Sequence, residues 1–376
     1  MRQPSRPSLL SGLILSTGTI LVCALLVEGL LQWTWKKHPY QWDRRLMFFS
    51  EGRNFENTDW GGLAYQPNAL VRAQTYYITS LDPPRIVKEY DYSLTTNRHG
   101  FVQLGEVTGT KPAILFLGNS YTEGQGAQPW FYGMEKSWPQ SSQFQLINGG
   151  VLASGVESWG GLYRDVSHKT HVAKVVIVFI SADWTRPLWQ FPERTLDCLR
   201  VAAKCDGSEG FYGLPEDSNA ARTQIDRIVK FRIDQLSARQ RTRSLIELTA
   251  LYQRLLEPSY RRLKWFLHTG NLRGVLGQEF VTSSRVAAEL VSHLGRDNVL
   301  FIHLPQKHEI GSGPDWFGRK ARAFIVENNL KSVDGFGSCG LTMSDFFVHD
   351  GHPNATGYGK ISRCVERAVK ETFEPH

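Results

Sequence analysis

The stretch that most constrains the fold is an apolar run at residues 113–117, which Lys111-Pro112 precedes and Gly118-Asn119 follows. A run that is apolar at every position is typical of a strand buried on both faces, as in a parallel sheet covered by helices. Such sheets place their ligands at the carboxyl ends of their strands. Ser120 follows this strand directly and is therefore a candidate nucleophile; the alternative is that it only caps a helix.

Strand and helix patterns alternate along much of the chain. Apolar runs predict further strands, and a spacing of three to four residues predicts the helices between them. The expected strands lie at 144–151, 174–180 and 299–305, and the expected helices at 158–168, 280–294, 318–329 and 356–371. This alternation predicts an α/β fold, a three-layer α/β/α sandwich with a mostly parallel sheet. It stops at about 187–275, where no strand pattern occurs, so this segment is interpreted as a helical insertion.

The N-terminal region is expected to form a membrane anchor. Residues 8–27 carry no charge, and this stretch is long enough to cross a bilayer as a helix. Four aromatic residues follow between 33 and 42. A cleaved signal peptide is the alternative, although no small-x-small site closes the apolar run. We expect three parts: an N-terminal tip and transmembrane anchor (1–33), a juxtamembrane lead-in with a short exposed strand (34–110), and the α/β domain (111–376).

Charge and cysteine content bound the partners and the compartment. The formal net charge is +7, and the segment 222–264 alone holds eleven basic and four acidic residues, so the rest of the chain is balanced. We therefore expect no nucleic-acid partner; the basic helices form a solvated face or contact an anionic membrane or acidic polymer. Two sequence-local cysteine pairs, Cys198 with Cys205 and Cys339 with Cys364, fit disulfides in an oxidising compartment, and four free thiols are the alternative.

The last loop of the chain supplies partners for Ser120. His352 is the expected base, and Asp350, two residues earlier, is the group expected to orient it. His349, Asp350 and His352 could instead bind a metal, but three ligands so close in one loop would need a fourth from elsewhere. We expect neither a metal nor a cofactor.

These motifs resemble those of a known superfamily. Residues 118–124, Gly-Asn-Ser-Tyr-Thr-Glu-Gly, resemble the first block of the SGNH, or GDSL-type, hydrolases, and residues 350–354, Asp-Gly-His-Pro-Asn, resemble the last block. Residues 147–150 are similar to the second block, and 96–101 to the stretch before the first block in membrane-anchored bacterial members. The resemblance spans about 95 to 370. It implies a flavodoxin-like sandwich and a serine esterase or acyl-transfer site, with the N–H groups of Ser120 and Gly150 holding the oxyanion.

Three departures from the family pattern bear on activity. Asn119 stands where Asp is commonest, and Ala182-Asp183 stands where the family carries Asn-Asp. That missing asparagine is an oxyanion donor, and losing one such donor costs on the order of a hundred- to a thousand-fold in rate. The polar residues that could supply a third oxyanion or substrate contact are Asn148, Ser181 and Asp183. Finally, the Asp-x-His spacing is similar to that of the polysaccharide O-acetyltransferase branch.

The resemblance therefore implies a membrane-anchored serine esterase or O-acyltransferase. We expect it to act on O-acyl esters, above all O-acetyl, of an envelope or extracellular glycan. Its expected place is the inner or cytoplasmic membrane, in a single pass, with the catalytic domain in the periplasm or outside the cell. The alternative is a catalytically weak domain that binds glycan or serves as an assembly subunit of an envelope complex, which the alanine at 182 favours.

Overall fold

The computed structural model describes residues 9–34, 44–139, 141–242 and 278–374. The chain divides into two compact units, one of Met1–Pro39 with Ser237–Leu276 and one of Tyr40–Leu236 with Gly277–His376. Helix α1 (Leu9–Thr34) belongs to the first unit. The expected transmembrane helix is not supported, since no helix within the described ranges is long and apolar enough to cross a membrane. Of the segment 222–264 expected to form basic helices, residues 243–264 lie outside the described residues.

The second unit contains the predicted parallel sheet. Its five strands run in the order β11-β10-β8-β6-β7, and every neighbouring pair is parallel. They are β6 (Ala113–Gly118), β7 (Gln145–Gly150), β8 (Val172–Phe179), β10 (Val299–His303) and β11 (Lys331–Asp334). The expected three-layer α/β/α core is thus confirmed.

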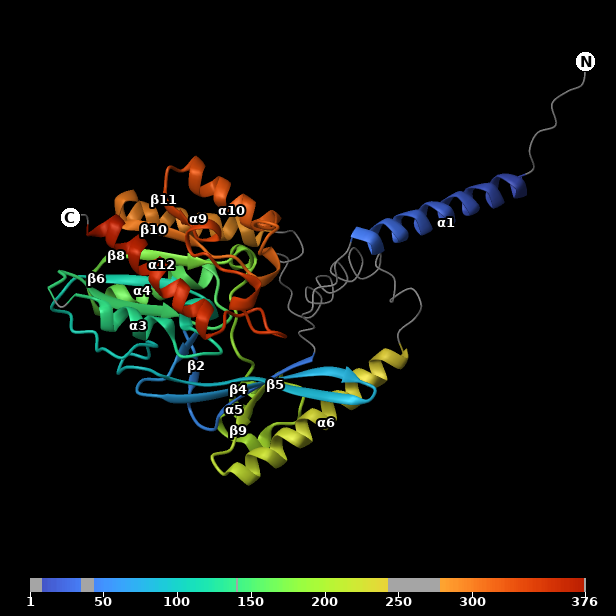
Figure 1. The fold of residues 1–376 in the computed structure, drawn as a ribbon, viewed down its shortest axis with the longest axis horizontal. Helices are drawn as coiled ribbons and strands as arrows, with labels where there is room; N and C mark the ends of the chain where they lie inside the picture. Colours follow the sequence, from blue (N-terminus) through green and yellow to red (C-terminus); the bar gives the residue numbers. More distant parts are fainter. Residues whose placement is uncertain (1–8, 35–43, 140, 243–277, 375–376) are drawn as a thin grey trace, which may run out of the picture. The chain divides into compact units, whose positions relative to one another are not determined.

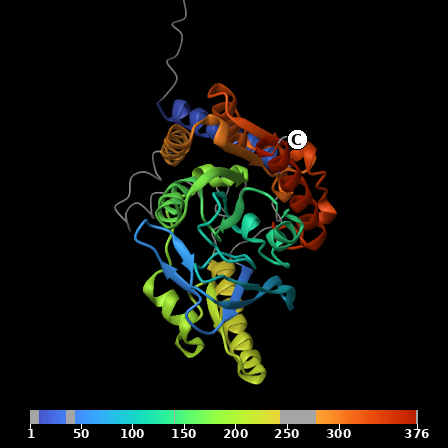
Figure 2. The same cartoon turned by 90° about the vertical axis from the view of Figure 1, so that its left-hand side faces the viewer.

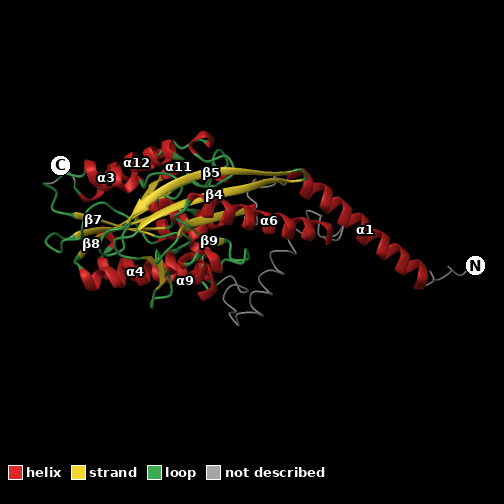
Figure 3. Cartoon of the chain, turned by 90° about the horizontal axis from the view of Figure 1, so that it is seen from below, coloured by secondary structure: helices red, strands yellow, loops and turns green. Residues whose placement is uncertain are grey.

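Helices cover both faces of this sheet, which explains why its central strands β6, β8 and β10 are mainly apolar. Along β6, Leu115 and Leu117 face one layer, formed by α4 (Val156–Lys169), α9 (Glu279–Leu294) and α10 (Trp316–Glu327). Ile114 and Phe116 face the other layer, formed by α3 (Trp130–Ser137) and α12 (Ala355–Phe373). Figure 3 shows the strands between these two layers. Because successive side chains of a strand point to opposite faces, both sets of alternate residues become core.

A second sheet, which the sequence did not predict, is built from the lead-in and the insertion together. Its strands run in the order β5-β4-β1-β9. They are β1 (Arg45–Ser50), β4 (Leu70–Leu81), β5 (Pro84–Thr95) and β9 (Phe211–Leu214). The single short exposed strand expected near residue 90 is therefore one half of a long antiparallel pair, β4 and β5 (Figure 1). The expectation that 187–275 contains no strand is wrong, because β9 pairs in parallel with β1.

The two faces of this second sheet have different partners. Leu46 and Phe48 of β1 pack with apolar residues of α6 (Ser218–Thr242), such as Ile228, on one face. Figure 2 shows α6 beside the sheet. On the other face, Met47 and Phe49 join a separate core with β5, with α5 (Glu193–Arg200) and with the short hairpin of β2 (Phe55–Asn57) and β3 (Leu63–Tyr65). β1 is therefore packed on both faces, whereas the edge strand β5 has exposed residues along much of its length.

Both expected disulfides form. Cys198 is bonded to Cys205 and Cys339 to Cys364, and Cys23 is the free cysteine of the described residues. The remaining elements are short: α2 (Ser120–Glu123), α11 (Gly335–Ser338) and the 3₁₀ turns η2 (Ser181–Thr185), η3 (Ala202–Lys204), η6 (Arg296–Asn298), η7 (Lys307–Glu309) and η8 (Met343–Asp345).

Candidate active site

Ser120 is the first residue of α2, directly after the carboxyl end of β6. Asn119 caps this short helix, since its side-chain oxygen accepts a hydrogen bond from the Tyr121 N–H at 2.7 Å. Gly118 cannot be replaced without rearrangement, because a Cβ there would lie 1.8 Å from the Thr122 hydroxyl and 2.7 Å from the Val178 carbonyl oxygen. The turn thus holds Ser120 at the sheet edge where parallel sheets bind their ligands.

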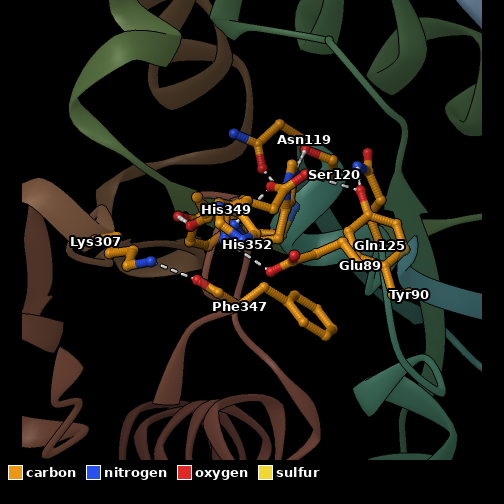
Figure 4. Close-up of polar contacts among 12 residues, drawn as sticks. Glu89, Tyr90, Asn119, Ser120, Gln125, Lys307, Phe347, His349 and His352 are labelled. Atoms are coloured by element: carbon orange, nitrogen blue, oxygen red, sulfur yellow. Dashed lines mark hydrogen bonds and ion pairs between the residues drawn. The ribbon is translucent and has the colours of Figure 1, made fainter. Parts of the chain in front are cut away.

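The structure brings Ser120, His352 and Asp350 together from distant parts of the chain. The Ser120 Oγ lies 2.7 Å from His352 Nε2 (Figure 4). His352 Nδ1 lies 2.5 Å from Asp350 Oδ1. The backbone N–H of His352 donates to the same carboxylate oxygen at 3.0 Å. All three side chains are buried. This is the arrangement of a nucleophile, a base and an orienting carboxylate that serine hydrolysis requires.

The second carboxylate oxygen of Asp350 is bound by residues that the sequence analysis missed. The hydroxyl of Tyr77 donates to Asp350 Oδ2 at 2.8 Å, and that of Tyr90 at 3.0 Å. Burial raises the pKa of Asp350, but the charge and hydrogen bond of His352, with further help from the Tyr77 hydroxyl, more than offset it and hold the pKa below its usual range. The sequence predicts a short exposed strand in the lead-in, but it gives no sign that this strand contacts the last loop.

The loop that carries His352 is braced from two further sides. The ammonium of Lys307 donates to the carbonyl oxygens of Phe347 and Val348, the latter at 2.7 Å. The N–H of His349 donates to the Glu89 carboxylate at 2.7 Å. Figure 4 shows Lys307 and Glu89 on either side of this loop. The loop therefore has fixed contacts with both η7 and β5.

Gly150, the expected second oxyanion donor, has its N–H engaged. This N–H donates to the side-chain oxygen of Asn148 at 2.9 Å. The Asn148 amide in turn donates to the Val102 carbonyl at 2.8 Å. A Cβ on Gly150 would come within 2.4 Å of the Glu123 backbone nitrogen, so glycine is required here for the close approach of α2 to β7. The structure thus gives residues 148 and 150 a packing role around Ser120.

The other two possible oxyanion contacts are also paired within the protein. Asp183 accepts hydrogen bonds from the Asn119 amide at 2.7 Å and from the Ile180 N–H at 2.9 Å. Burial raises its pKa to about 6, against the opposing charge of Arg186. The Ser181 hydroxyl donates to Glu309 at 2.6 Å. Asn148, Ser181 and Asp183 are therefore each held by hydrogen bonds within the protein, in the turns that surround Ser120.

A buried carboxyl that the sequence analysis did not single out lies in the same short helix as Ser120. Glu123 is fully buried, and burial raises its pKa to about 8. The hydroxyls of Tyr65 and Tyr92 are near it, although neither pair reaches ordinary hydrogen-bond geometry. At neutral pH, Glu123 is therefore mainly a neutral acid packed among tyrosines behind the candidate nucleophile.

The metal site considered at His349, Asp350 and His352 is not where potential ligand atoms gather among the described residues. Among the described residues, ligand atoms of His308, Glu309 and Asp315 lie within 4.8 Å of one another. The Glu309 carboxylate already accepts hydrogen bonds from Ser181, from the Asp315 N–H at 2.8 Å and from the Gln306 N–H at 2.9 Å. These contacts account for its burial without an ion.

The comparisons with known proteins find similarity in fold. No family model matches the sequence, and the search of curated proteins gives no match. Among solved structures, a lipase/acylhydrolase from Enterococcus faecalis is 13% identical, with a TM-score of 0.35, and covers 69% of this chain and 96% of its own. A catalytic mutant of an acetylxylan esterase from Geobacillus stearothermophilus is 12% identical, with a TM-score of 0.36, and covers 70% and 95%. A putative acylhydrolase from Bacteroides fragilis is 14% identical, with a TM-score of 0.33, and covers 72% and 91%.

The fold and the placement of the candidate triad resemble what the SGNH, or GDSL-type, motifs imply. A parallel sheet carries Ser120 after its first strand, and Asp350 and His352 precede the last helix. Identities and TM-scores this low leave the chemistry to be inferred from the site's own geometry.

Proposed function

We propose that this chain is a serine esterase or O-acyltransferase that acts on O-acyl esters, above all O-acetyl, of an envelope or extracellular glycan. The observation that supports the reaction type is the continuous hydrogen-bonded path from Ser120 through His352 to Asp350. A serine hydroxyl is a weak nucleophile until a neighbouring base takes its proton, and this path supplies that base in a fixed orientation.

The reaction has two halves. His352 takes the proton of Ser120 Oγ as this oxygen attacks the ester carbonyl carbon, and it then gives the proton to the departing alcohol oxygen, which leaves an acyl group on Ser120. In the second half, His352 takes a proton from water or from a sugar hydroxyl as its oxygen attacks the acyl carbon, and His352 then gives this proton to the departing Ser120 Oγ. Water yields a free acid and makes the protein an esterase; a sugar yields a new ester and makes it a transferase.

The developing oxyanion needs donors. The Ser120 N–H is the first of α2, and the first N–H groups of a helix have no partner within it. The N–H of Gly150 becomes a second donor only by exchanging its bond to Asn148 for one to the substrate. With alanine at 182, the proposed enzyme works with fewer side-chain donors than the family pattern provides, so we expect a modest rate.

The glycan part of the proposal rests on charge. Arg222, Arg227 and Lys230 are exposed on α6 together with one acid, Asp226, and an excess of basic residues favours an acidic polymer. A second candidate function, a glycan-binding or assembly subunit with little catalysis, is favoured by Ala182 and by the engaged N–H of Gly150. The intact path from Ser120 to Asp350 favours the enzyme.

A fluorophosphonate probe tests the enzyme proposal on the full-length chain. We expect wild type to be labelled and to hydrolyse p-nitrophenyl acetate, and Ser120→Ala and His352→Ala to lose both. Ser344→Ala is the matched control, since its hydroxyl is exposed near the same loop. Wild type that neither takes the label nor cleaves the ester would favour the binding-subunit function.

We also propose that the domain acts outside the cytoplasm. Two disulfides persist in oxidising compartments and are rare in reducing ones. This proposal does not require the membrane anchor expected for residues 8–33.

A further inference from the structure

The second sheet reaches the catalytic carboxylate through two hydroxyls. His352 uses only Asp350 Oδ1, and the hydroxyls of Tyr77 and Tyr90 converge on Oδ2. We propose that Tyr77 and Tyr90 are positioning residues, which hold the Asp350 carboxylate in the orientation that directs Oδ1 at His352. The second sheet would then be part of the active site. This inference rests on the proposed serine mechanism and adds to it residues from outside the parallel core.

The strand geometry explains how two hydroxyls come to the same oxygen. Tyr77 lies on β4 and Tyr90 on the neighbouring β5. Thr75 is paired with Tyr90, but Tyr76 is paired with Lys88, so Glu89 is an extra residue at a β-bulge. A bulge bends its strand and redirects nearby side chains. Here the extra residue accepts the hydrogen bond from the His349 N–H, so the bulge binds the catalytic loop at a second point.

The Tyr90 hydroxyl is itself oriented. Gln125, which follows α2 closely in the chain, donates from its side-chain amide to the Tyr90 oxygen at 2.7 Å (Figure 4). Because the Tyr90 oxygen accepts a hydrogen bond from the Gln125 amide, the proton of the Tyr90 hydroxyl is free to point at Asp350. A chain of contacts therefore runs from Gln125 through Tyr90, Asp350 and His352 back to Ser120.

Burial and charge make these donors necessary. Asp350 is 1% exposed, and a carboxylate removed from water to this degree is costly unless hydrogen bonds replace the lost hydration. The charged or titratable groups that act on it are His352 on its own loop, Tyr77, Tyr90 and Tyr92 on the sheet, Arg45 of β1, Lys307 of η7 and Tyr358 of α12. Burial, followed by the charge of Asp350, raises the pKa of Tyr77 and Tyr90, so both remain protonated donors.

The first test compares Tyr77→Phe, Tyr90→Phe and the double variant with Tyr76→Phe. Tyr76 is the neighbour of Tyr77, and its hydroxyl donates to Gln74 at 2.9 Å and does not contact Asp350. Each positioning variant should lower kcat roughly tenfold, and the double variant further, with little change in KM. The acidic limb of the pH–rate profile should move to higher pH. Without the tyrosine hydroxyl bound to it, the Asp350 carboxylate stabilises the protonated form of the base His352 more strongly. Tyr76→Phe should match wild type, and melting curves report folding.

The second test does not depend on turnover. The proton between His352 Nδ1 and Asp350 gives a low-field proton NMR signal, which His352→Ala identifies by its loss. We expect the signal to move in the Tyr77→Phe and Tyr90→Phe variants and to stay in place in Tyr76→Phe. If the signal moves in the variants but the protein cleaves no ester, the proposed function is refuted, while the positioning role of Tyr77 and Tyr90 stands. A double variant with the wild-type signal and pH profile would overturn the inference, whatever its rate.

Discussion

At the scale of single residues, the turn that presents Ser120 depends on an amide at position 119. The Asn119 oxygen accepts from the Tyr121 N–H, while its nitrogen donates to the Asp183 carboxylate at 2.7 Å. An aspartate could cap the helix in the same way, but it has no proton to donate when ionised. The asparagine that departs from the family pattern is therefore matched to the buried carboxylate of Asp183.

We predict that Asn119→Asp destabilises the protein more at pH 8 than at pH 5. Two ionised carboxylates would face each other at pH 8, whereas at pH 5 one of them retains a proton, because burial already raises the pKa of Asp183 to about 6. The loss at pH 8 should be roughly 1.5–3 kcal/mol, the range for hydrogen bonds to charged groups. Urea unfolding at both pH values measures it. Asn119→Ser is the control; an equal pH dependence there would contradict the prediction.

We predict that Glu123→Gln flattens the pH dependence of stability. The pKa of Glu123 is raised from 4.5 to about 8 in the folded chain. Its favourable contribution is therefore complete below pH 4.5 and is lost as pH rises through about 8, so wild type weakens over this window. The neutral glutamine cannot ionise, and the free energy of unfolding should change less between pH 5 and pH 8. Glu327→Gln, at an exposed position of α10, should keep the wild-type slope.

At the scale of elements, two features of the last helix, α12, flank the loop that carries His352: the cap of the helix and a disulfide. Asn354 caps α12, since its side-chain oxygen accepts from the N–H groups of Thr356 and Gly357. The disulfide between Cys339 and Cys364 joins α12 to the segment that precedes the loop. His352 lies between these two fixed points, so the disulfide limits how far the loop can move.

We predict that removing the Cys339–Cys364 disulfide costs more stability than removing the Cys198–Cys205 disulfide. Their sequence separations are 25 and 7. In the chain-entropy model, the longer loop should be worth about 1 kcal/mol more, from roughly 3.5 and 2.4 kcal/mol. Denaturant unfolding of the two double Cys→Ala variants compares them directly. A larger loss for the shorter loop would show that native packing outweighs loop entropy here.

At the scale of the whole molecule, two segments far apart in sequence make one sheet beside the catalytic loop. β1, β4 and β5 come from the lead-in, whereas β9 comes from the insertion. The Cys198–Cys205 disulfide lies next to β9 in the same apolar cluster. The Cys198–Cys205 disulfide therefore packs against the sheet that supplies Tyr77 and Tyr90, and the state of these cysteines reports the compartment.

We predict that the protein taken from its native cells contains both disulfides and a single free thiol. Alkylation before and after reduction, followed by mass measurement, counts the thiols; Cys23 is the expected free one. Five free thiols before reduction would contradict the proposal that the domain acts outside the cytoplasm.

Sequence patterns determined the parallel core and the identities of Ser120, His352 and Asp350. The central core strands are mainly apolar, and the motif residues stand next to strand or helix ends, so both signals are local. The tertiary structure decided the rest. Pairing between residues 45–50 and 211–214, the contact of Tyr77 and Tyr90 with Asp350, and the bond that engages the N–H of Gly150 each depend on which segments meet in space. Periodicity reports how a strand is buried, but it does not report what the strand is buried against.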